Sequence, residues 1–443
     1  MGKTRRGAAL GQCQLTKTNG GVEALSPAAA DIFAKCRSEQ LEMYKGAEDL
    51  GLNPFYRQLS SEIGPTITMG GAEVVMLGSN NYLGLTTDPR VKRAAIDAVE
   101  RYGTGVTGSR LLNGTLPLHT ELEELLADWV GMPQALVFST GYSANLGLIS
   151  SIVQAGDAVF CDSAAHASLV DGARLAEGAL RAFFHNKPNS LRRGLRSWRA
   201  QPDSGGVLVA VDGIYSMEGD WAPLTEIRSI CDEHGARLLV DEAHALGVVG
   251  PSGAGTAAAT GVRADLVMGT FSKSLASCGG FIASSADVID FLRLFSRPIL
   301  FTASNVPASL GAALEAAKIA RREDWRREKA LALAGRLHSG LSQLGYDVGA
   351  PTESSIVPLH TDDLLGTGVF WRALLDRGVY TNCSMPPAVQ RPMLRTSVMA
   401  THTEAQIDRA LAAFEEISRD GTVARERQRL MGLLELELDG SRA

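Results

Sequence analysis

Paired cysteines, long apolar runs and a surplus of basic residues are all missing from this sequence. Its six cysteines are scattered without a Cys-x-x-Cys pair, which argues against a zinc site or a disulfide framework and favours reduced thiols. No apolar run is long enough to cross a bilayer, and the polar N-terminus lacks the apolar core of a secretory signal. The 43 Lys and Arg residues do not exceed the 49 Asp and Glu residues, so nothing points to nucleic acid or an anionic membrane. We therefore expect a cytoplasmic protein with no transmembrane segment, no bound metal and no nucleic-acid partner.

Apolar segments that alternate with helical patterns occupy the middle of the 443-residue chain. Buried strands are predicted at 135–138, 158–161, 207–211, 237–240, 264–268 and 281–283. Strands of this kind, separated by helices, predict an α/β fold whose mostly parallel sheet is covered by helices on both faces. Ligands of such sheets bind beyond the carboxyl ends of the strands.

The pattern changes at both ends of this region. Residues 1 to about 25 show no apolar periodicity, and a helix is predicted over 28–50. After Pro307 the predicted elements are a long helix, two strands with a helix after each, and a charged helical tail, at 308–344, 355–359, 370–377, 394–398, 404–417 and 422–438. We therefore divide the chain into an N-terminal arm and helix (1–60), a large domain (61–307) and a smaller C-terminal α+β domain with a helical tail (308–443).

The segment from Met268 to Phe281 contains a lysine that is a candidate nucleophile. Lys273 follows a buried strand and stands among small hydroxyl residues, so partial desolvation would lower its pKa and make its amine reactive. Thr270 and Ser272 can donate hydrogen bonds to a phosphate, and a Gly-Gly pair follows that lets the backbone approach a flat ring. This arrangement is typical of a Schiff-base lysine for pyridoxal phosphate, and the alternative is a solvated lysine after a buried strand.

The four residues Asp241-Glu-Ala-His244 follow another apolar strand. A carboxylate at Asp241 could keep a pyridine nitrogen protonated, and an imidazole at His244 could bond the phenolic oxygen of the same ring. The same letters occur in a helicase motif, but that motif requires a G-x-x-x-x-G-K-[ST] loop, which this chain lacks. A purely structural Asp–His pair is the other alternative.

Two turns between a predicted strand and a helix could complete a cofactor site. In Ser139–Ala144, Gly141 and free N–H groups at a helix N-terminus suit a phosphate, while Tyr142 could either stack on a ring or pack in the core. His166 could stack on a cofactor, or it could belong to the capping region of the next helix.

Arg395 lies in the predicted strand 394–398. A guanidinium in such a strand needs an anionic partner, either the carboxylate of a substrate or a carboxylate of the protein itself.

Taken together, these segments resemble the α-oxoamine synthases, which are pyridoxal 5'-phosphate (PLP) enzymes of fold type I. The resemblance extends from about Asn53 to Ile417. It is carried, in order, by Asn80–Gly84, Gly103–Arg110, Thr140–Asn145, His166–Leu169, Ser216–Asp220, Ala222–Leu224, Asp241–His244, Thr270–Lys273, and Arg395 with Thr401–Thr403. Each motif is short, but their occurrence in this order is specific, and within the family the chain is most similar to members that use serine.

The resemblance implies a role for each matching residue. Lys273 would bind PLP covalently and later move the Cα proton of the amino acid, while Asp241 pairs with the ring nitrogen and His244 with the phenolic oxygen. The other implied contacts are His166 on the ring, Gly141, Tyr142, Ser216, Thr270 and Ser272 around the cofactor, Asn81 and Arg395 (with His166) on the substrate carboxylate, and Thr302 on the cofactor phosphate of a second subunit in a homodimer.

The implied reaction joins an amino acid, L-serine first, to an acyl thioester carried by coenzyme A or an acyl carrier protein, with loss of CO2 and of the free thiol. Alternatives are a sister enzyme that uses alanine or glycine, an aminotransferase of the same fold, and a non-catalytic partner subunit. Family members that use serine have an arginine before a Pro-Pro pair where this chain has Met385, and Arg391 is a possible substitute. The identity of the amino acid is therefore left open by the sequence.

Overall fold

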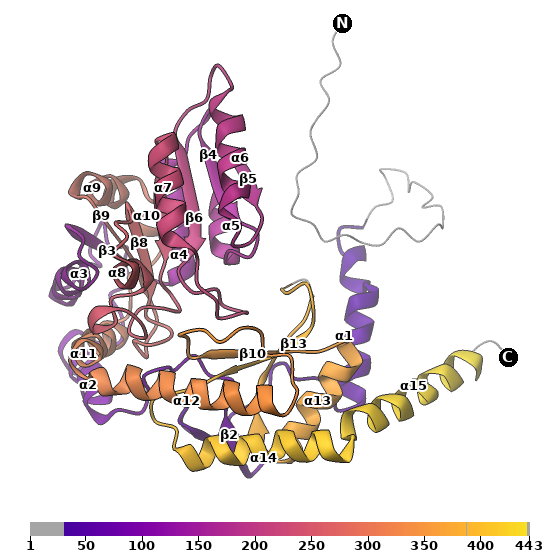
Figure 1. Cartoon of the computed structure of the whole chain (residues 1–443). Helices are drawn as coiled ribbons and strands as arrows, with labels where there is room; N and C mark the ends of the chain where they lie inside the picture. Colours follow the sequence, from indigo (N-terminus) through magenta and orange to yellow (C-terminus); the bar gives the residue numbers. More distant parts are fainter. Residues whose placement is uncertain (1–30, 387, 441–443) are drawn as a thin grey trace, which may run out of the picture.

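A seven-stranded sheet forms the centre of the larger part of the protein (Figure 1). The computed structural model describes residues 31–386 and 388–440. The strand order is β3 (Gln134–Phe138), β9 (Gly280–Ser284), β8 (Leu266–Thr270), β7 (Arg237–Asp241), β6 (Val207–Asp212), β4 (Ala158–Asp162) and β5 (Ala179–Phe183). Strand β9 is antiparallel to both neighbours, and the other six are parallel to one another. The predicted α/β fold with a mostly parallel sheet is confirmed.

Both faces of this sheet are covered because successive residues of its strands enter two separate cores. In β6, Val209 and Val211 pack on one face, whereas Leu208 and Ala210 pack on the other. The first face is covered by α2 (Pro89–Tyr102), α3 (Pro117–Trp129), α6 (Pro188–Arg199), α7 (Leu224–His234), α8 (Thr256–Thr260) and α11 (Pro307–Arg322). The second face is covered by α4 (Gly141–Ile152), α5 (Ala167–Leu175), α9 (Ala286–Phe295) and α10 (Arg297–Leu300). The strands are therefore nearly all apolar, as burial on both faces requires.

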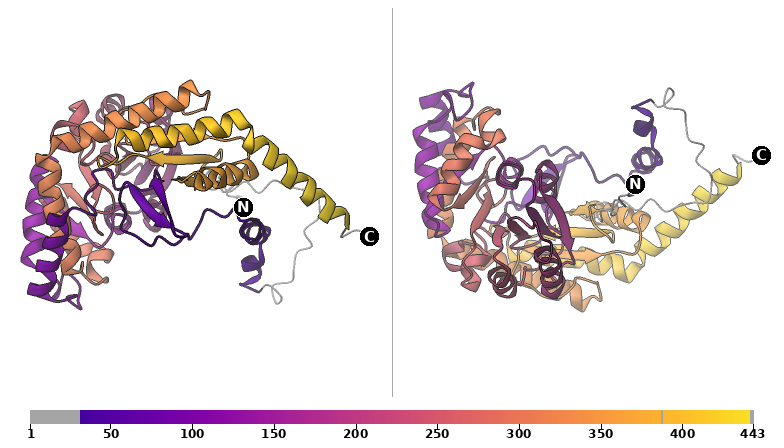
Figure 2. Two further views of the ribbon diagram at one scale, coloured as in Figure 1. Left: turned by 90° about the horizontal axis from the view of Figure 1, so that it is seen from below. Right: turned by 90° about the horizontal axis from the view of Figure 1, so that it is seen from above.

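A second, smaller unit packs a three-stranded antiparallel sheet against helices. Its strands are, in order, β10 (Ile356–His360), β13 (Met393–Ser397) and β12 (Asn382–Ser384). Its helices are α12 (Asp324–Gln343), α13 (Leu364–Asp376), α14 (Glu404–Asp420) and α15 (Thr422–Gly440). Trp371 and Phe414, both fully buried, lie in its core. Helix α15 extends away from the rest of the molecule in Figures 1 and 2.

An early segment of the chain lies with this smaller unit. Strand β2 (Ala72–Met76) pairs antiparallel with β1 (Thr66–Met69) and parallel with β11 (Val379–Tyr380). Val75 of β2 is fully buried in the same core as Trp371. The sequence groups residues from 61 onward with the large domain, because nothing local signals a pairing between segments so far apart in the chain.

The single long helix predicted over 308–344 is wrong, because the structure has two helices there. Helix α11 ends at Arg322, and α12 begins at Asp324. Between them, Glu323 has the non-helical dihedral angles φ −101° and ψ 72°. Helix α11 packs on α2 and α3 of the large unit, whereas α12 belongs to the smaller one. The break is therefore the point at which the chain passes from one unit to the other.

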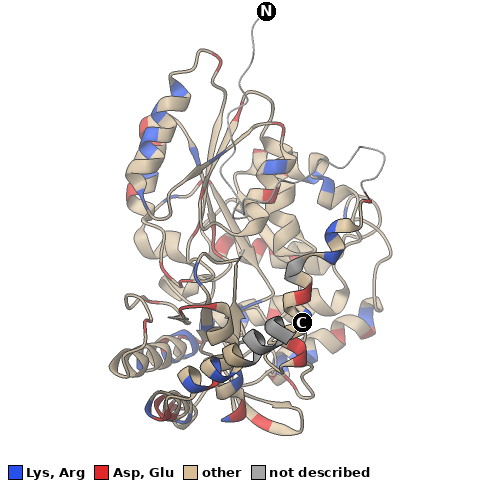
Figure 3. Cartoon of the chain, turned by 90° about the vertical axis from the view of Figure 1, so that its right-hand side faces the viewer, with Lys and Arg blue, Asp and Glu red and all other residues tan. Residues whose placement is uncertain are grey.

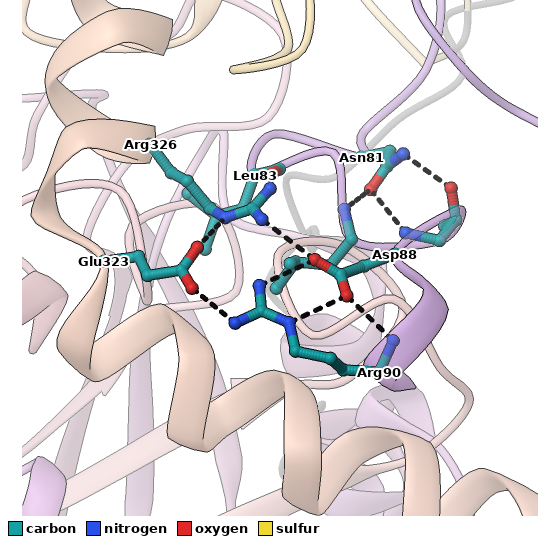
Figure 4. A network of polar contacts seen from close by, with 8 residues as sticks. Asn81, Leu83, Asp88, Arg90, Glu323 and Arg326 are labelled. Carbon is teal, nitrogen blue, oxygen red and sulfur yellow. Dashed lines mark hydrogen bonds and ion pairs between the residues drawn. The ribbon is translucent and has the colours of Figure 1, made fainter. Parts of the chain in front are cut away.

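An ion-pair network stabilises this break (Figure 4). Arg326, only 6% exposed, donates to Glu323 at 2.8 Å, to Asp88 at 2.9 Å and to the carbonyl oxygen of Leu83 at 2.9 Å. Arg90 bonds the same two carboxylates, Asp88 at 2.8 Å and Glu323 at 2.6 Å. Two guanidinium groups and two carboxylates thus join the start of α12 to the segment that precedes α2.

Other elements lie where the sequence predicts little. Helix α1 (Glu39–Asp49) follows a 3₁₀ turn at Ala34–Arg37, within the helix predicted over 28–50, and a second 3₁₀ turn lies at Pro251–Gly253. The predicted N-terminal arm lies outside the described residues. In the part of the chain that the structure describes, no helix combines the length and apolarity needed to cross a bilayer. Figure 3 shows acidic and basic residues interspersed on the outer helices of both units.

We expect Arg326→Met to lower the free energy of unfolding by about 2–3 kcal/mol, measured by chemical denaturation. The loss stays below that of an isolated buried charge because Arg90 still pairs with Asp88. Arg336→Met is the matched control: Arg336 lies on the same helix as Arg326, and its exposed ion pair with Asp408 of α14 should contribute little. Equal effects of the two substitutions would show that the network does not stabilise the break.

Candidate active site

Two adjoining cavities lie at the carboxyl ends of the central strands. The first, of about 260 Å³, is lined by residues that include Gly141, Asp212, Asp241 and Thr270. The second, of about 450 Å³, extends to the smaller unit and is lined by Asn80, Ser216 and Arg395 among others. Three residues line both cavities: His166, His244 and Lys273. The candidate site therefore has two compartments that meet at these three side chains.

A larger hollow of about 910 Å³ lies near the opposite ends of the same strands. Three of its charged side chains pair with one another, since Arg228 and Arg237 each lie 2.7 Å from a carboxylate oxygen of Asp265. The reactive groups predicted from the sequence are all elsewhere, so we assign the site to the two smaller cavities.

Lys273 follows β8 and is half-buried, with its amine between the two compartments. Burial lowers the pKa of Lys273 from its usual 10.5 to about 8; the nearby Asp241 opposes this shift and Arg395 adds to it. A substantial fraction of the amine is therefore neutral near physiological pH, which a nucleophile requires. The alternative of a solvated surface lysine is wrong.

Two carboxylates stand side by side at the ends of neighbouring strands. Asp212 ends β6, Asp241 ends β7, and the two residues are paired in register. Asp241 accepts hydrogen bonds from Asn145 at 2.8 Å and from the backbone N–H of Ala243 at 2.9 Å. Burial, reinforced by the charge of Asp241, raises the pKa of Asp212 well above its usual range. Like charges this close are costly, so a proton on Asp212 is favoured.

The two histidines of the site are held by different contacts. His244 is buried, and its Nδ1 lies 2.6 Å from the hydroxyl oxygen of Tyr82. Burial, together with the positive charges of Lys273 and Arg395, holds the pKa of His244 well below 6.5, so its imidazole is neutral. His166 caps α5, and its Nδ1 lies 2.8 Å from the hydroxyl oxygen of Ser168. The capping interpretation of His166 is confirmed, and its contact with a cofactor stays a prediction for a residue that lines both cavities.

The N-terminus of α4 opens into the first cavity. Thr140 caps the helix, and Thr140, Gly141 and Tyr142 all line the cavity. The hydroxyl oxygens of Thr270 and Ser272 lie opposite, 2.9 Å apart. Free N–H groups at a helix N-terminus, joined by hydroxyl donors, form a site for an anion such as phosphate.

Three features of this region refine the sequence prediction. The Tyr142 side chain is 44% exposed and donates its hydroxyl proton to Asp171, so it does not pack in the core. A Cβ on Gly141 would lie within about 3 Å of Thr270, so only glycine fits there. The Gly-Gly pair is needed for packing, because a Cβ on Gly279 would lie 2.3 Å from the ring of Phe271 and one on Gly280 would lie 2.5 Å from the Cα of Gly141.

Arg395 of β13 is a buried cation with no carboxylate partner in the part of the chain that the structure describes. It is 5% exposed and donates from Nε to the carbonyl oxygen of Ser216 and from Nη2 to the Tyr82 hydroxyl at 3.3 Å. No carboxylate among residues 31–386 and 388–440 is within ion-pair distance of it. The alternative of a structural carboxylate partner is therefore excluded for this part of the chain, and the guanidinium faces the second cavity as an anion site.

Three residues considered from the sequence lie outside both cavities. Asn81 donates to Thr86 at 2.6 Å and accepts from the N–H of Leu85 at 3.0 Å, so its amide holds its own loop while Asn80 lines the second cavity. Thr302 is exposed and donates to the carbonyl oxygen of Pro298. Arg391 pairs with Asp347 at 2.7 Å.

The sequence predicts no individual role for Asp212, Asn145 or Tyr82. Asp212 follows an all-apolar strand, as Asp241 does, and this signal could have revealed it. Asn145 and Tyr82 carry no such signal, because their significance depends on side chains that only the fold brings near.

His185 joins two of the loops that line the site. Its Nδ1 lies 2.9 Å from Asp162, in the segment leading to His166, and its Nε2 lies 3.0 Å from Asp220, in the segment that follows Ser216. Burial by itself lowers the pKa of His185, but the hydrogen bonds to the two carboxylates outweigh burial and raise it to about 10. The imidazolium is thus a charged clamp between the loops.

Residues 72–414 of the chain match the family Aminotransferase class I and II. The chain is 43% identical over 381 residues to a serine palmitoyltransferase of Caulobacter vibrioides, a match that covers 85% of this chain and 94% of the relative. It is 40% identical over 376 residues to an 8-amino-7-oxononanoate synthase of Geobacter sulfurreducens, a match that covers 84% of this chain and 95% of the relative.

Solved structures show the same relationship. The serine palmitoyltransferase of Sphingomonas wittichii has a TM-score of 0.84 and 36% identity, covering 88% of this chain and 99% of that one. A structure of a serine palmitoyltransferase (SPT) with PLP has a TM-score of 0.85 and 37% identity. The match covers 89% of this chain and 100% of that one.

We expect His185→Gln to destabilise the protein more at low pH than at high pH. Because the folded-state pKa of about 10 exceeds the unfolded value near 6.5, the clamp contributes fully below pH 6.5 and loses its contribution as the pH rises towards 10. The loss should be roughly 1–3 kcal/mol at pH 6, allowing for partial solvent screening, and clearly smaller at pH 9. Chemical denaturation at both pH values measures the loss, with the half-buried His338→Gln, whose imidazole contacts a backbone carbonyl oxygen, as control. A loss independent of pH would rule out the charged clamp.

Proposed function

Since the chain belongs to the aminotransferase class I and II family and, within it, to the α-oxoamine synthases, we propose that it is a PLP-dependent acyltransferase that joins L-serine to an acyl thioester. The products are an α-amino ketone, CO2 and the free thiol. The observation that carries this proposal is the position of Lys273, where a cavity suited to a ring with an anionic group meets a cavity lined by Arg395, which has no carboxylate partner among the described residues.

The residues of the first cavity fit PLP. The helix N-terminus at Gly141, with Tyr142, Thr270 and Ser272, provides donors and space for the phosphate. Asp241 would hold the proton of the ring nitrogen, His244 would bond the phenolic oxygen, and His166 would lie against the ring. PLP, once bound, serves as an electron sink for negative charge at the Cα of the amino acid.

The protein's own groups divide the remaining tasks. The amine of Lys273, neutral in part near pH 8, takes the Cα proton of the amino acid and returns it after CO2 has left. Arg395 holds the substrate carboxylate through N–H groups not used by Ser216 and Tyr82. The apolar side of the second cavity, with Phe55, Met217 and Tyr380, would accept the acyl thioester.

A sister activity with alanine or glycine is the second candidate, and one observation favours it. Met385, which replaces an arginine of serine-using members, packs against the apolar core of the smaller unit. Arg391 does not compensate, since it pairs with Asp347 outside the cavity. Arg395 is therefore the arginine that remains for the carboxylate.

An absorbance titration with product analysis tests the function. The visible band of the PLP-loaded protein is followed while L-serine, L-alanine or glycine is added, with and without an acyl thioester of coenzyme A or of an acyl carrier protein. We expect L-serine to perturb the band at the lowest concentration, and CO2 and free thiol to appear only with the thioester. A keto acid without CO2 would indicate an aminotransferase, and absence of the band would contradict PLP binding.

Two variants with matched controls complete this test. Lys273→Ala should abolish product formation while the protein stays folded, whereas Lys318→Ala, at an exposed pair with Glu121, should not. Arg395→Ala should weaken amino-acid binding by about 2–5 kcal/mol, because it removes the buried cation that would pair with the substrate carboxylate, and Arg391→Ala should not. Full activity of the Lys273 variant would refute the mechanism.

We further propose that the enzyme is a homodimer in the cytoplasm. The cytoplasmic location is supported by the free thiols of the cysteines within residues 31–386 and 388–440. The dimer is supported by exposed apolar side chains on two adjoining segments, including Leu112 (78% exposed) and Phe301 (71%). The segments are joined by a 2.9 Å hydrogen bond from the N–H of Ser304 to the carbonyl oxygen of Gly108. Thr302, next to Phe301, would reach the cofactor phosphate of the partner.

We expect Leu112→Asp with Phe301→Asp to convert a dimer into monomers in sedimentation velocity experiments, with loss of activity, because the surface would no longer exclude water. Leu175→Asp, at an exposed leucine elsewhere on the surface, is the control. A wild-type protein that sediments as a monomer would contradict the shared site.

A further inference from the structure

Tyr82 is a fully buried tyrosine at the junction of the two units. It follows β2, and its hydroxyl lies between side chains from three parts of the chain. The hydroxyl oxygen is 2.6 Å from Nδ1 of His244 in the large unit and 3.3 Å from Nη2 of Arg395 in the smaller unit. Oδ1 of Asn80 lies 3.1 Å away. One oxygen atom thus contacts both the histidine of the ring cavity and the arginine of the anion cavity.

The hydrogen-bonding capacities of these neighbours determine where the hydroxyl proton lies. The guanidinium of Arg395 can only donate, so it occupies a lone pair of the hydroxyl oxygen. The hydroxyl has one proton, for which His244 and the carbonyl of Asn80 compete. The imidazole nitrogen is the more basic acceptor and the nearer one, at 2.6 Å against 3.1 Å. The proton is therefore donated to Nδ1 of His244.

This assignment defines the other nitrogen of His244. A neutral imidazole that accepts at Nδ1 carries its proton on Nε2. Burial and nearby positive charges keep His244 neutral, and Nε2 has no hydrogen-bond partner in the described part of the chain. His244 lines both cavities. It therefore presents an N–H donor to an oxygen acceptor bound there.

We propose that Tyr82 is a positioning residue that holds His244 as the Nε2–H tautomer and couples this donor to the anion bound at Arg395. The coupling rests on the proposed function, in which Arg395 binds the carboxylate of the amino acid. The route is short and direct, from guanidinium to hydroxyl to imidazole. When an anion neutralises Arg395, the hydrogen bond from its guanidinium to the hydroxyl oxygen of Tyr82 weakens. Binding in the second cavity therefore changes the strength of the Nε2–H donor that His244 presents to the first.

Nitrogen NMR of the cofactor-free protein, labelled with ¹⁵N-histidine, tests the tautomer. His244→Gln identifies the His244 signals. We expect wild-type His244 to be neutral with its proton on Nε2, and we expect Tyr82→Phe to produce a mixture with the Nδ1–H form, since Nδ1 loses its donor. A wild-type His244 with its proton on Nδ1 would overturn the proposal by itself, whether or not the variant folds.

The amino-acid dissociation constant of the PLP-loaded protein tests the coupling. Tyr82→Phe should raise the constant for L-serine about tenfold, because the guanidinium loses one of its two positioning contacts. Tyr346→Phe is the control, since its hydroxyl donates to the carbonyl oxygen of Phe414, and both residues lie outside the two cavities; its dissociation constant and His244 signals should not change. Unchanged binding and unchanged signals in Tyr82→Phe would refute the role of Tyr82. A wild-type protein that binds no amino acid would count against the proposed function, while the NMR comparison would still decide the tautomer.

Discussion

Buried charge at the junction of the two units is the constraint on which the rest of this structure depends. Asp212 and Asp241 end neighbouring parallel strands, so the sheet itself forces two carboxylates together. Lys273 from the next strand and Arg395 from the smaller unit bring positive charge to the same place. Each of these groups would be costly if left alone in a buried site. Opposite charges partly offset the cost of burying these groups, whereas burial itself is the main cause of the low pKa of Lys273 and the high pKa of Asp212.

The position of the smaller unit is set by loops that bridge the two units. The loop from Ile214 to Trp221 leaves the large unit and is held by the smaller one: Gly219 accepts from Thr352 at 3.0 Å, Trp221 donates to Glu353 at 2.9 Å, and Ser216 accepts from Arg395. The loop around Tyr82 makes a second bridge, and it is anchored through Leu83 to Arg326. The arginine that faces the site and the arginine that stabilises the helix break thus bind the same bridging segment.

This arrangement explains how one site can serve two substrates. The compartment with Asp241 is enclosed by the large unit, whereas the compartment with Arg395 is shared between the units. Under the proposed function, a chain that has Arg395 and Met385 would rely on a single guanidinium for the substrate carboxylate. Its selectivity among small amino acids would then depend on how firmly Ser216 and Tyr82 orient that guanidinium.

The sequence by itself determined the features that depend on adjacent residues. Apolar strands alternating with helices predicted the α/β sheet, and Lys273, Asp241 and His244 were found because reactive residues directly follow buried strands. Tertiary structure alone decided which residues of distant segments meet. The pairing of β2 with β11, the break at Glu323 and the contact between Tyr82 and His244 each join segments far apart in the chain. No proline or glycine marks the break, and it persists because Arg90 and Arg326 bind Glu323 there. The periodicity of apolar residues depends only on residues that are near one another in the sequence. These contacts depend instead on interactions between side chains that only folding brings together.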